Sequence, residues 1–428
     1  MPAIIENILV FGDSLSDRGA MANSALAAFS GLWGKSPHGR FTNGYVWLDY
    51  FIRQLKTEDE VQLVPPQFET KHPFFSINND EYVGIETAPV FARTYCIGGM
   101  TSYDYSSNLT PGKFMRNTTS QFLENLDGLR EEAIKDDTYM KLSEDEKKTT
   151  LVIEWSGAND LVTVNPKPTM KAAERAVTAR IQHVEAMIEQ GYMHFVLFNL
   201  ADLSLTPRYQ NEPYKLRLQA HHVSDYFNQE LHTQLEHLKI KYPACQLDIF
   251  DANALFCDAY ENPSKYALDE STKTQPFLDS VAFKDDDPST TADGYMFWDD
   301  VHPTEAVHLT LGRAFHKQVF LPNYVFNFTE QPLVRQFQKM YGMRLEDDMQ
   351  RRCMPRAKSF DYSAENLHID QIVRHGLFQD GKRTNSVMQA LQWSDKKGVC
   401  TRDDTILQEA FTAAYAQDES QRKNLSRK

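Results

Sequence analysis

The chain of 428 residues lacks any apolar run long enough to cross a bilayer as a helix. Its start, Met-Pro-Ala-Ile-Ile-Glu-Asn, lacks the basic n-region of a signal peptide, so the sequence predicts no cleaved leader. The content of 41% hydrophobic and 12% aromatic residues is typical of a globular protein, and the length allows more than one domain. We therefore expect a globular protein that is cytoplasmic or is exported by a leaderless route, as some bacterial effectors are.

Cysteine is scarce: five residues, an odd number, are widely spaced with no CxxC pair. This pattern predicts neither a zinc site nor a disulfide framework, and it fits a reducing compartment. There is also no phosphate-binding glycine loop. We expect no metal and no cofactor. The cysteines are Cys96, Cys245, Cys257, Cys353 and Cys400.

Positive charges are outnumbered by negative ones, because 45 Lys and Arg stand against 59 Asp and Glu, a net charge of −14. Residues 323–428 carry 17 Lys and Arg against 14 Asp and Glu, or +3, which leaves −17 for residues 1–322. The strongly negative charge of residues 1–322 argues against a nucleic-acid partner and against simple adsorption to anionic lipid. The mildly basic tail indicates a different partner, either a protein or a membrane surface.

Short apolar runs alternate with helical patterns along the first three-quarters of the chain. Buried parallel strands read as continuous apolar runs, so this alternation predicts an α/β fold around a parallel sheet. The expected strands are 8–11, 91–97, 151–155, 195–198 and, as the last strand, 247–250. The expected helices are 46–55, 170–190, 214–238 and 306–320, with a charged surface insertion at 129–150. Residues 56–90 are expected to be irregular, and residues 260–292 to form a mobile polar loop.

Reactive residue types follow several of these strands. Ser14 follows the first strand, and a serine hydroxyl needs an imidazole to take its proton and a carboxylate to orient that imidazole. Asp299 and His302 are three residues apart on one turn, whereas Asp300, the competing carboxylate, should point elsewhere. An oxyanion also needs donors. The Ser14 N–H, the Gly99 N–H and the Asn159 amide are candidates, because strand ends of a parallel sheet meet in one crevice.

Each of these residues taken alone is more often structural, but their occurrence together resembles the GDSL lipase/esterase family, also called the SGNH hydrolases. The resemblance spans roughly residues 4–320. Its motifs are Val10-Phe-Gly-Asp-Ser-Leu-Ser-Asp17, His38-Gly-Arg-Phe-Thr-Asn-Gly44, Ile97-Gly-Gly-Met-Thr101, Gly157-Ala-Asn-Asp160 and Phe297-Trp-Asp-Asp-Val-His-Pro-Thr304.

This resemblance implies a flavodoxin-like three-layer α/β/α fold and hydrolysis of acyl esters. It implies Ser14 as nucleophile, His302 as base and Asp299 as the group that orients it, with Ser14, Gly99 and Asn159 as oxyanion donors. The chain departs from the family pattern near Thr94 and at residues 17–20. Bulky Met100 is expected to narrow an acyl pocket. Four further residues are candidates for pocket walls, although core packing is the more common role for each: Trp33, Phe41, Trp298 and His308.

The leading functional hypothesis is a serine ester hydrolase that acts on a lipid, of the lysophospholipase A or carboxylesterase type. Acyl transfer to an alcohol acceptor and carbohydrate O-deacetylation are alternatives on the same fold. A non-catalytic binding protein should have lost one member of the set Ser14, Gly99, Asn159 and His302, and none is missing.

The resemblance predicts a domain boundary at 322. Residues 1–322 form the expected hydrolase domain, and residues 323–428 an expected helical appendage with no catalytic constellation of its own. Apolar residues at helical spacing support the helices: Leu333, Phe337 and Tyr341, then Ile369, Ile372 and Val373, then Leu407, Phe411 and Ala414. The appendage packs on the hydrolase as a scaffold or, on the sharper hypothesis, docks a partner or membrane.

Overall fold

The structure is a computed structural model, and it describes residues 2–18, 20–21, 40–55, 80–85, 88–105, 124–140, 142–165, 167–283 and 292–327. The chain divides into two compact units. The first holds Met1–Pro73, Ala92–Ala133 and Glu144–Asn327, and the second holds Phe74–Phe91, Ile134–Ser143 and Phe328–Lys428. The first unit ends at Asn327, and residues 1–322 as a hydrolase domain and 323–428 as an appendage remain a prediction. The helices expected after Phe328 lie outside the described residues.

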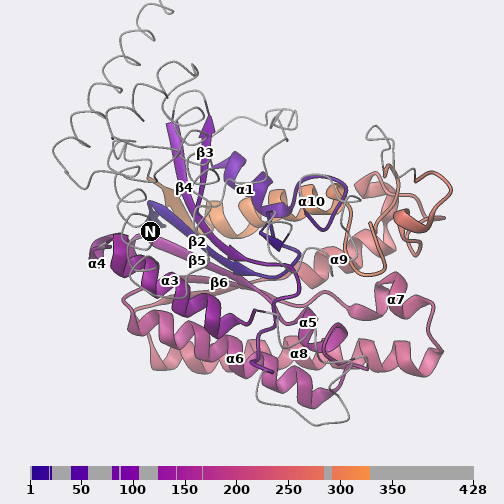
Figure 1. Cartoon of the computed structure of the whole chain (residues 1–428), viewed down its shortest axis with the longest axis horizontal. Helices are drawn as coiled ribbons and strands as arrows, with labels where there is room; N and C mark the ends of the chain where they lie inside the picture. The colour runs from indigo at the N-terminus through magenta and orange to yellow at the C-terminus, as the bar shows by residue number, and fades with distance from the viewer. Residues whose placement is uncertain are drawn as a thin grey trace, which may run out of the picture. The chain divides into compact units, whose positions relative to one another are not determined.

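A parallel sheet forms the centre of the first unit (Figure 1). The strand order β4-β2-β5-β6-β7 is the flavodoxin-like order 2-1-3-4-5 when these strands are counted along the chain. All four pairings between them are parallel. This confirms the α/β fold class. The strands are β2 (Asn7–Gly12), β4 (Ala88–Cys96), β5 (Thr150–Trp155), β6 (His194–Phe198) and β7 (Gln246–Phe250), with β3 (Asp80–Ile85) beside β4.

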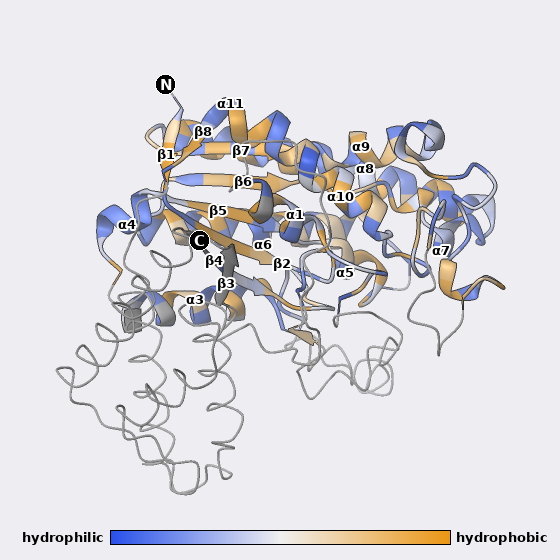
Figure 2. Cartoon of the chain, turned by 90° about the horizontal axis from the view of Figure 1, so that it is seen from above, coloured by the Kyte–Doolittle hydropathy of each residue, from blue (hydrophilic) through white to orange (hydrophobic). Residues whose placement is uncertain are grey.

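Helices cover both faces of this sheet, which gives three layers. Helices α1 (Trp47–Gln54) and α10 (Glu305–Phe315) pack together on one face. Helices α6 (Met170–Glu189) and α8 (Tyr214–Lys241) pack together on the other (Figure 1). Figure 2 shows apolar strands between helices of mixed hydropathy, as expected for a sheet that is buried on both sides.

An aromatic cluster joins the sheet to the α1 and α10 layer. The Trp47 ring lies 4.5 Å from that of Phe198 and 5.4 Å from that of Phe315, measured between centroids. Successive residues of β5 face opposite layers: Trp155 packs against Trp47, whereas Glu154 bonds Arg180 of α6. This alternation is the pleat of a strand, and it explains why every residue of β5 is buried.

Three expectations about secondary structure were wrong. A further strand, β8 (Tyr324–Phe326), follows β7 and pairs in parallel with β1 (Ala3–Ile5) in a separate two-stranded sheet. Within residues 56–90, expected to be irregular, Asp80–Ile85 forms β3. Most of residues 260–283 form turns and short 3-10 helices rather than one long loop, because Phe277 is buried there against Trp298.

The remaining helices surround the site or connect the strands. They are α3 (Leu126–Met140) and α4 (Glu144–Lys148), which form the expected charged segment, α5 (Ala158–Val162), α7 (Pro207–Gln210), α9 (Ala252–Glu261) and α11 (Leu321–Asn323). None of the described helices combines the length and the apolar composition that a membrane span requires.

Candidate active site

Ser14 lies in the turn that follows β2, at the carboxyl edge of the sheet. Two backbone hydrogen bonds shape this turn: the Asp13 N–H donates to the Trp155 carbonyl at 3.3 Å, and the Ser16 N–H donates to the Asp13 carbonyl at 3.0 Å. A Cβ on Gly12 would lie only 2.8 Å from the Ser16 Cβ. Glycine at position 12 therefore allows the chain to fold back tightly and to hold the Ser14 side chain in place.

His302 and Asp299 complete a line of hydrogen bonds that begins at Ser14. The Ser14 Oγ lies 2.7 Å from His302 Nε2, and His302 Nδ1 lies 2.7 Å from Asp299 Oδ2. The other oxygen of Asp299 accepts the backbone N–H groups of Val301, at 2.9 Å, and of His302, at 2.7 Å. The Phe41 ring packs on the His302 ring with centroids 5.1 Å apart. The imidazole is thus held from two sides.

The charges in this line support each other. Burial disfavours the imidazolium, but the Asp299 carboxylate and its hydrogen bond outweigh burial and raise the pKa of His302. Burial also opposes ionisation of Asp299, yet the His302 charge and the donated hydrogen bonds hold the pKa of that carboxyl below its usual value. Asp299 therefore stays a carboxylate, and it stabilises a positive charge on His302 when one forms.

Asp300 is oriented away from this line and binds Arg208. Its two carboxylate oxygens accept from Arg208 Nε at 2.7 Å and Nη2 at 3.1 Å, and its carbonyl accepts the Arg208 N–H at 2.9 Å. The third guanidinium nitrogen, Nη1, donates to the carbonyl of Val162, the last residue of α5, at 3.1 Å. Arg208 is a residue that the sequence interpretation missed, and it connects the His302 loop to the helix that carries Asn159.

Three N–H groups are candidates for an oxyanion hole, those of Ser14, Gly99 and Asn159. The Asn159 amide nitrogen donates one hydrogen to the Met100 carbonyl at 3.0 Å, and its oxygen accepts from Thr163 at 2.6 Å. These contacts fix the amide and leave its second hydrogen to donate. Gly99 has φ 82°, a left-handed conformation that favours glycine. Within the described residues, neither the Ser14 N–H nor the Gly99 N–H has a hydrogen-bond acceptor.

Two buried carboxylates hold the loop on either side of Gly99. Asp17 accepts the Gly98 N–H at 2.7 Å, and Asp160 accepts the N–H groups of Ser102 at 2.8 Å and of Tyr103 at 3.0 Å. Both aspartates are fully buried. The sequence contained both residues inside its motifs, but their contacts depend on tertiary structure that the motifs do not specify.

Asp13, the neighbour of Ser14, is a third buried carboxyl. Burial raises the pKa of Asp13 to about 7, although the hydrogen bond from the Leu15 N–H and the nearby His302 charge lower it. Asp13 therefore titrates near neutral pH, beside the nucleophile candidate. Its carboxylate, when charged, favours the protonated form of His302.

A cavity of about 130 Å³ adjoins Ser14, Asn159 and His302. Much of its lining is apolar: Val162, Leu200, Leu203, Leu205, Phe256 and Phe297. Because Ser14 and the apolar wall border the same space, a group bound in the cavity lies next to the hydroxyl oxygen.

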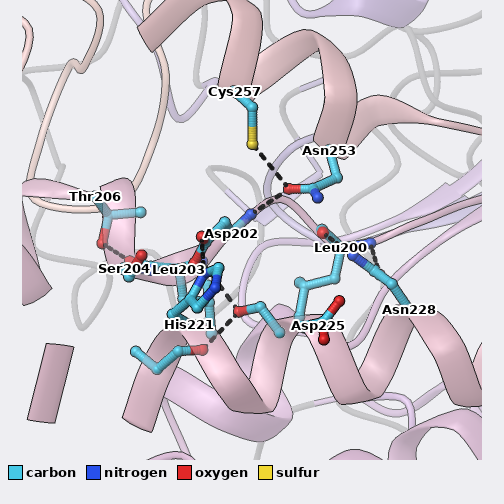
Figure 3. Close-up of polar contacts among 12 residues, drawn as sticks. Leu200, Asp202, Leu203, Ser204, Thr206, His221, Asp225, Asn228, Asn253 and Cys257 are labelled. Atoms are coloured by element: carbon cyan, nitrogen blue, oxygen red, sulfur yellow. Dashed lines mark hydrogen bonds and ion pairs between the residues drawn. The ribbon is translucent and has the colours of Figure 1, made fainter. Parts of the chain in front are cut away.

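Hydrogen bonds to α8 and α9 fix the cavity wall at residues 200–206 (Figure 3). Leu200 exchanges two 2.8 Å hydrogen bonds with the Asn228 side chain of α8. The Asp202 N–H donates to Asn253 of α9 at 2.8 Å, and the Asp202 carboxylate lies 2.6 Å from His221 Nδ1. The wall is therefore preformed, with its polar backbone groups satisfied by side chains of the flanking helices.

The sequence-based candidates for pocket walls have mixed outcomes. Trp298 is buried beside Phe277, and His308 is buried with its Nδ1 facing the Trp47 N–H, so neither lines the cavity. The bulky Met100 side chain is buried and is also absent from the lining, so it does not narrow this cavity. Phe41 contacts His302. Trp33 lies outside the described residues.

No group of three or more His, Cys, Asp or Glu side chains within the described ranges is arranged to hold a metal ion. The contacts that surround Ser14 are hydrogen bonds and ion pairs between protein groups.

Comparisons with known proteins show the family to which this chain is similar. The sequence model of the GDSL-like lipase/acylhydrolase family matches residues 8–315. The chain is 26% identical over 346 residues to a phosphatidylcholine-sterol acyltransferase of Aeromonas hydrophila, covering 71% of this chain and 87% of that protein. It is 25% identical over 305 residues to the secreted effector protein SseJ of Salmonella typhimurium, covering 71% of this chain and 61% of that protein.

A GDSL esterase/lipase of Arabidopsis thaliana is 24% identical to this chain over 338 residues, and the match covers 71% of this chain and 84% of that protein. The family match extends from β2, which precedes Ser14, to the end of α10, which follows His302. This chain belongs to the GDSL-like lipase/acylhydrolase family.

Proposed function

We propose that this protein hydrolyses acyl esters of lipids through an acyl intermediate on Ser14. One observation carries the proposal: Ser14, His302 and Asp299 form a continuous hydrogen-bonded line beside an apolar cavity. A serine hydroxyl that contacts a carboxylate-oriented imidazole is an activated nucleophile.

In the first step, the Ser14 Oγ attacks the ester carbonyl carbon while His302 Nε2 takes the hydroxyl proton. Asp299 keeps the Nδ1 proton of His302 in place, so that Nε2 is free to accept. The imidazolium then gives its proton to the leaving alcohol oxygen as the C–O bond breaks. The products are the free alcohol and an ester between Ser14 and the acyl group.

Negative charge develops on the carbonyl oxygen during this attack. The N–H groups of Ser14 and Gly99 and the second amide hydrogen of Asn159 are the proposed donors to it. Loss of one such donor typically costs about 10²–10³ in kcat. Asp17 and Asp160 are proposed to position the Gly99 loop, because their carboxylates fix the backbone on both sides of that residue.

In the second step, a water molecule attacks the acyl-serine, and His302 acts again as base and then as acid. The cavity wall of leucine and phenylalanine supports an acyl chain as the bound group. Each methylene of an acyl chain that is buried against this apolar part of the wall contributes about 0.8 kcal/mol. This favours a lipid ester over a carbohydrate acetate.

Acyl transfer is the second candidate, because one relative is a phosphatidylcholine-sterol acyltransferase. An alcohol acceptor would then replace water in the second step, with the same residues in the same roles. The two activities are distinguished by their products: incubation with a phospholipid and a sterol yields free fatty acid in one case and sterol ester in the other.

The central test is Ser14→Ala. Turnover of p-nitrophenyl butyrate and release of fatty acid from lysophospholipid should both fall to background, and labelling by a fluorophosphonate probe should disappear. The Ser16→Ala variant is the matched control, since the Ser16 hydroxyl accepts from the Trp47 indole and is buried away from the cavity. Labelling that persists in a folded Ser14→Ala protein would remove Ser14 from the mechanism.

A further inference from the structure

Apolar side chains are exposed where α6 and α8 begin. Met170, the first residue of α6, is 44% exposed, and Tyr214 and Leu218, one turn apart at the start of α8, are 69% and 36% exposed. The Gln219 side chain of α8 donates to the Pro168 carbonyl at 2.7 Å. The two helix starts are therefore neighbours, and their exposed residues form one surface.

This surface also carries lysines. Lys167, Lys171 and Lys215 are all exposed, and within the described part of the chain none of them has a carboxylate within ion-pair distance. Other lysines of the unit differ: the exposed amines of Lys239 and Lys241 bind Glu236 and Glu185. We call Lys167, Met170, Lys171, Tyr214, Lys215 and Leu218 the helix-start patch.

The patch lies at the same edge of the sheet as Ser14. Helices α6 and α8 follow strands β5 and β6, and a helix that returns over a parallel sheet begins at the carboxyl edge of the strands. The chain segments that lead into α6 and α8 also line the cavity: Thr163 lies shortly before α6, and Arg208 lies shortly before α8. Figure 1 shows α5 and α7 at this end of the layers.

The local charge contrasts with that of the whole protein. Residues 167–175 hold Lys167, Lys171 and Arg175 against Glu174, and residues 212–218 hold Lys215 and Arg217 against Glu212. Both segments are net positive in a chain of net charge −14. Exposed apolar and aromatic side chains among unpaired lysines match the interfacial zone of a bilayer that contains anionic lipid.

We propose that the helix-start patch docks this protein on the surface of a membrane that contains anionic lipid, with the carboxyl edge of the sheet toward the lipid. This proposal rests on the proposed hydrolysis of lipid esters, because docking there brings the cavity to its substrate. Tyr214, Met170 and Leu218 enter the headgroup zone, and the lysines bind lipid phosphates and carboxylates.

The test measures vesicle binding by Ser14→Ala protein, which leaves the lipid intact. Sedimentation with vesicles of phosphatidylcholine, with and without phosphatidylserine, is compared for this parent and for a version that also carries Lys167→Gln, Lys171→Gln and Lys215→Gln. Each lysine near an anionic surface contributes about fivefold in affinity, so the triple change should weaken binding roughly a hundredfold. Binding to pure phosphatidylcholine should be weak for both proteins.

A matched control carries Lys239→Gln, Lys241→Gln and Lys265→Gln. These changes remove the same charge from lysines outside the patch, which pair with Glu236, Glu185 and Asp258. A second pair compares Tyr214→Ser with Ile240→Ser, since Ile240 is 80% exposed at the other end of α8. The control variants should bind as the parent does. The proposal is overturned if patch and control variants lose binding equally, if neither loses it, or if the patch changes alter the oligomeric state instead.

Hydrolysis is measured separately, with Ser14 present. The patch variants should turn over monomeric p-nitrophenyl butyrate at the parent rate but lose activity on lipid in phosphatidylserine-containing vesicles. If no ester is hydrolysed, yet the Ser14→Ala protein binds anionic vesicles through the patch, the proposed function fails and docking stands. Hydrolysis of vesicle lipid that is equal in patch and parent proteins overturns docking and leaves the function intact.

Discussion

Replacing Asp299 by Asn is expected to lower kcat by about four orders of magnitude without unfolding the protein. The Asn side chain keeps an oxygen at the position that accepts the Val301 and His302 N–H groups, so the loop geometry is retained. Its amide NH₂ then faces His302 Nδ1, where Asp299 Oδ2 lies at 2.7 Å. Two donors cannot share that contact, so the ring takes the tautomer with its proton on Nε2. That proton prevents His302 from accepting from Ser14.

Four orders of magnitude correspond to about 5.4 kcal/mol of barrier. Asp300→Asn, one residue along, should behave differently. The Asp300 side chain is 48% exposed and its Arg208 partner 34% exposed, so their ion pair contributes about 0–1 kcal/mol. The carbonyl of residue 300 also continues to accept the Arg208 N–H. We expect kcat to fall by about fivefold at most.

The assay is steady-state turnover of p-nitrophenyl butyrate, with near-ultraviolet circular dichroism to show that both variants are folded. Asp299→Asn should also lose the raised pKa of His302, so its residual activity should extend to lower pH than that of the wild type. Equal losses in the two variants, or a larger loss for Asp300→Asn, would refute the assignment of the orienting carboxylate to Asp299.

Three further predictions concern pH, packing and the tail. Activity should rise with pH as His302 loses its proton, because the base must be neutral, and this limb should lie above the usual histidine range since Asp299 raises the pKa of His302. Asp13→Asn should move the same limb of the kcat/KM profile to lower pH, because the Asp13 charge also raises the pKa of His302. Gly312→Ala should lower the free energy of unfolding by about 1–3 kcal/mol in a urea titration, since its Cβ would lie 2.6 Å from the Trp47 carbonyl oxygen. A protein without residues 330–428 that is folded by circular dichroism should still turn over p-nitrophenyl acetate, because we expect no residue after Asn323 to take part in the chemical step.

The central sheet was predictable because its strands are buried on both faces. The runs Ile8–Phe11 and Phe195–Phe198 are continuously apolar, and 151–155 is apolar except for Glu154; each lies within an observed strand. Strand β8 was missed because it is three residues long, with one residue, Val325, half exposed. Three apolar residues are too short a run to predict a strand from the sequence.

The contact between Asp299 and His302 was also predictable, because it is local. A separation of three residues on one turn brings the Asp299 carboxylate close to the His302 ring, independently of the rest of the chain. The cavity was not predictable in the same way. Its wall at residues 200–206 holds no motif, and side chains of Asn228 and Asn253, from two later helices, fix its backbone. Such pairings between distant residues follow from the assembled layers.

The contacts of Arg208 show why two adjacent aspartates are not equivalent. In the loop before α10, Asp299 is directed inward to His302 and Asp300 outward to Arg208. A guanidinium has five donors in a rigid fork, and here it binds both oxygens of Asp300 and also the carbonyl at the end of α5. One cation therefore ties the loop that carries His302 to the helix that carries Asn159. A lysine offers a single charged nitrogen, which cannot reproduce this fork geometry, so an arginine at position 208 is the residue that can hold both segments together.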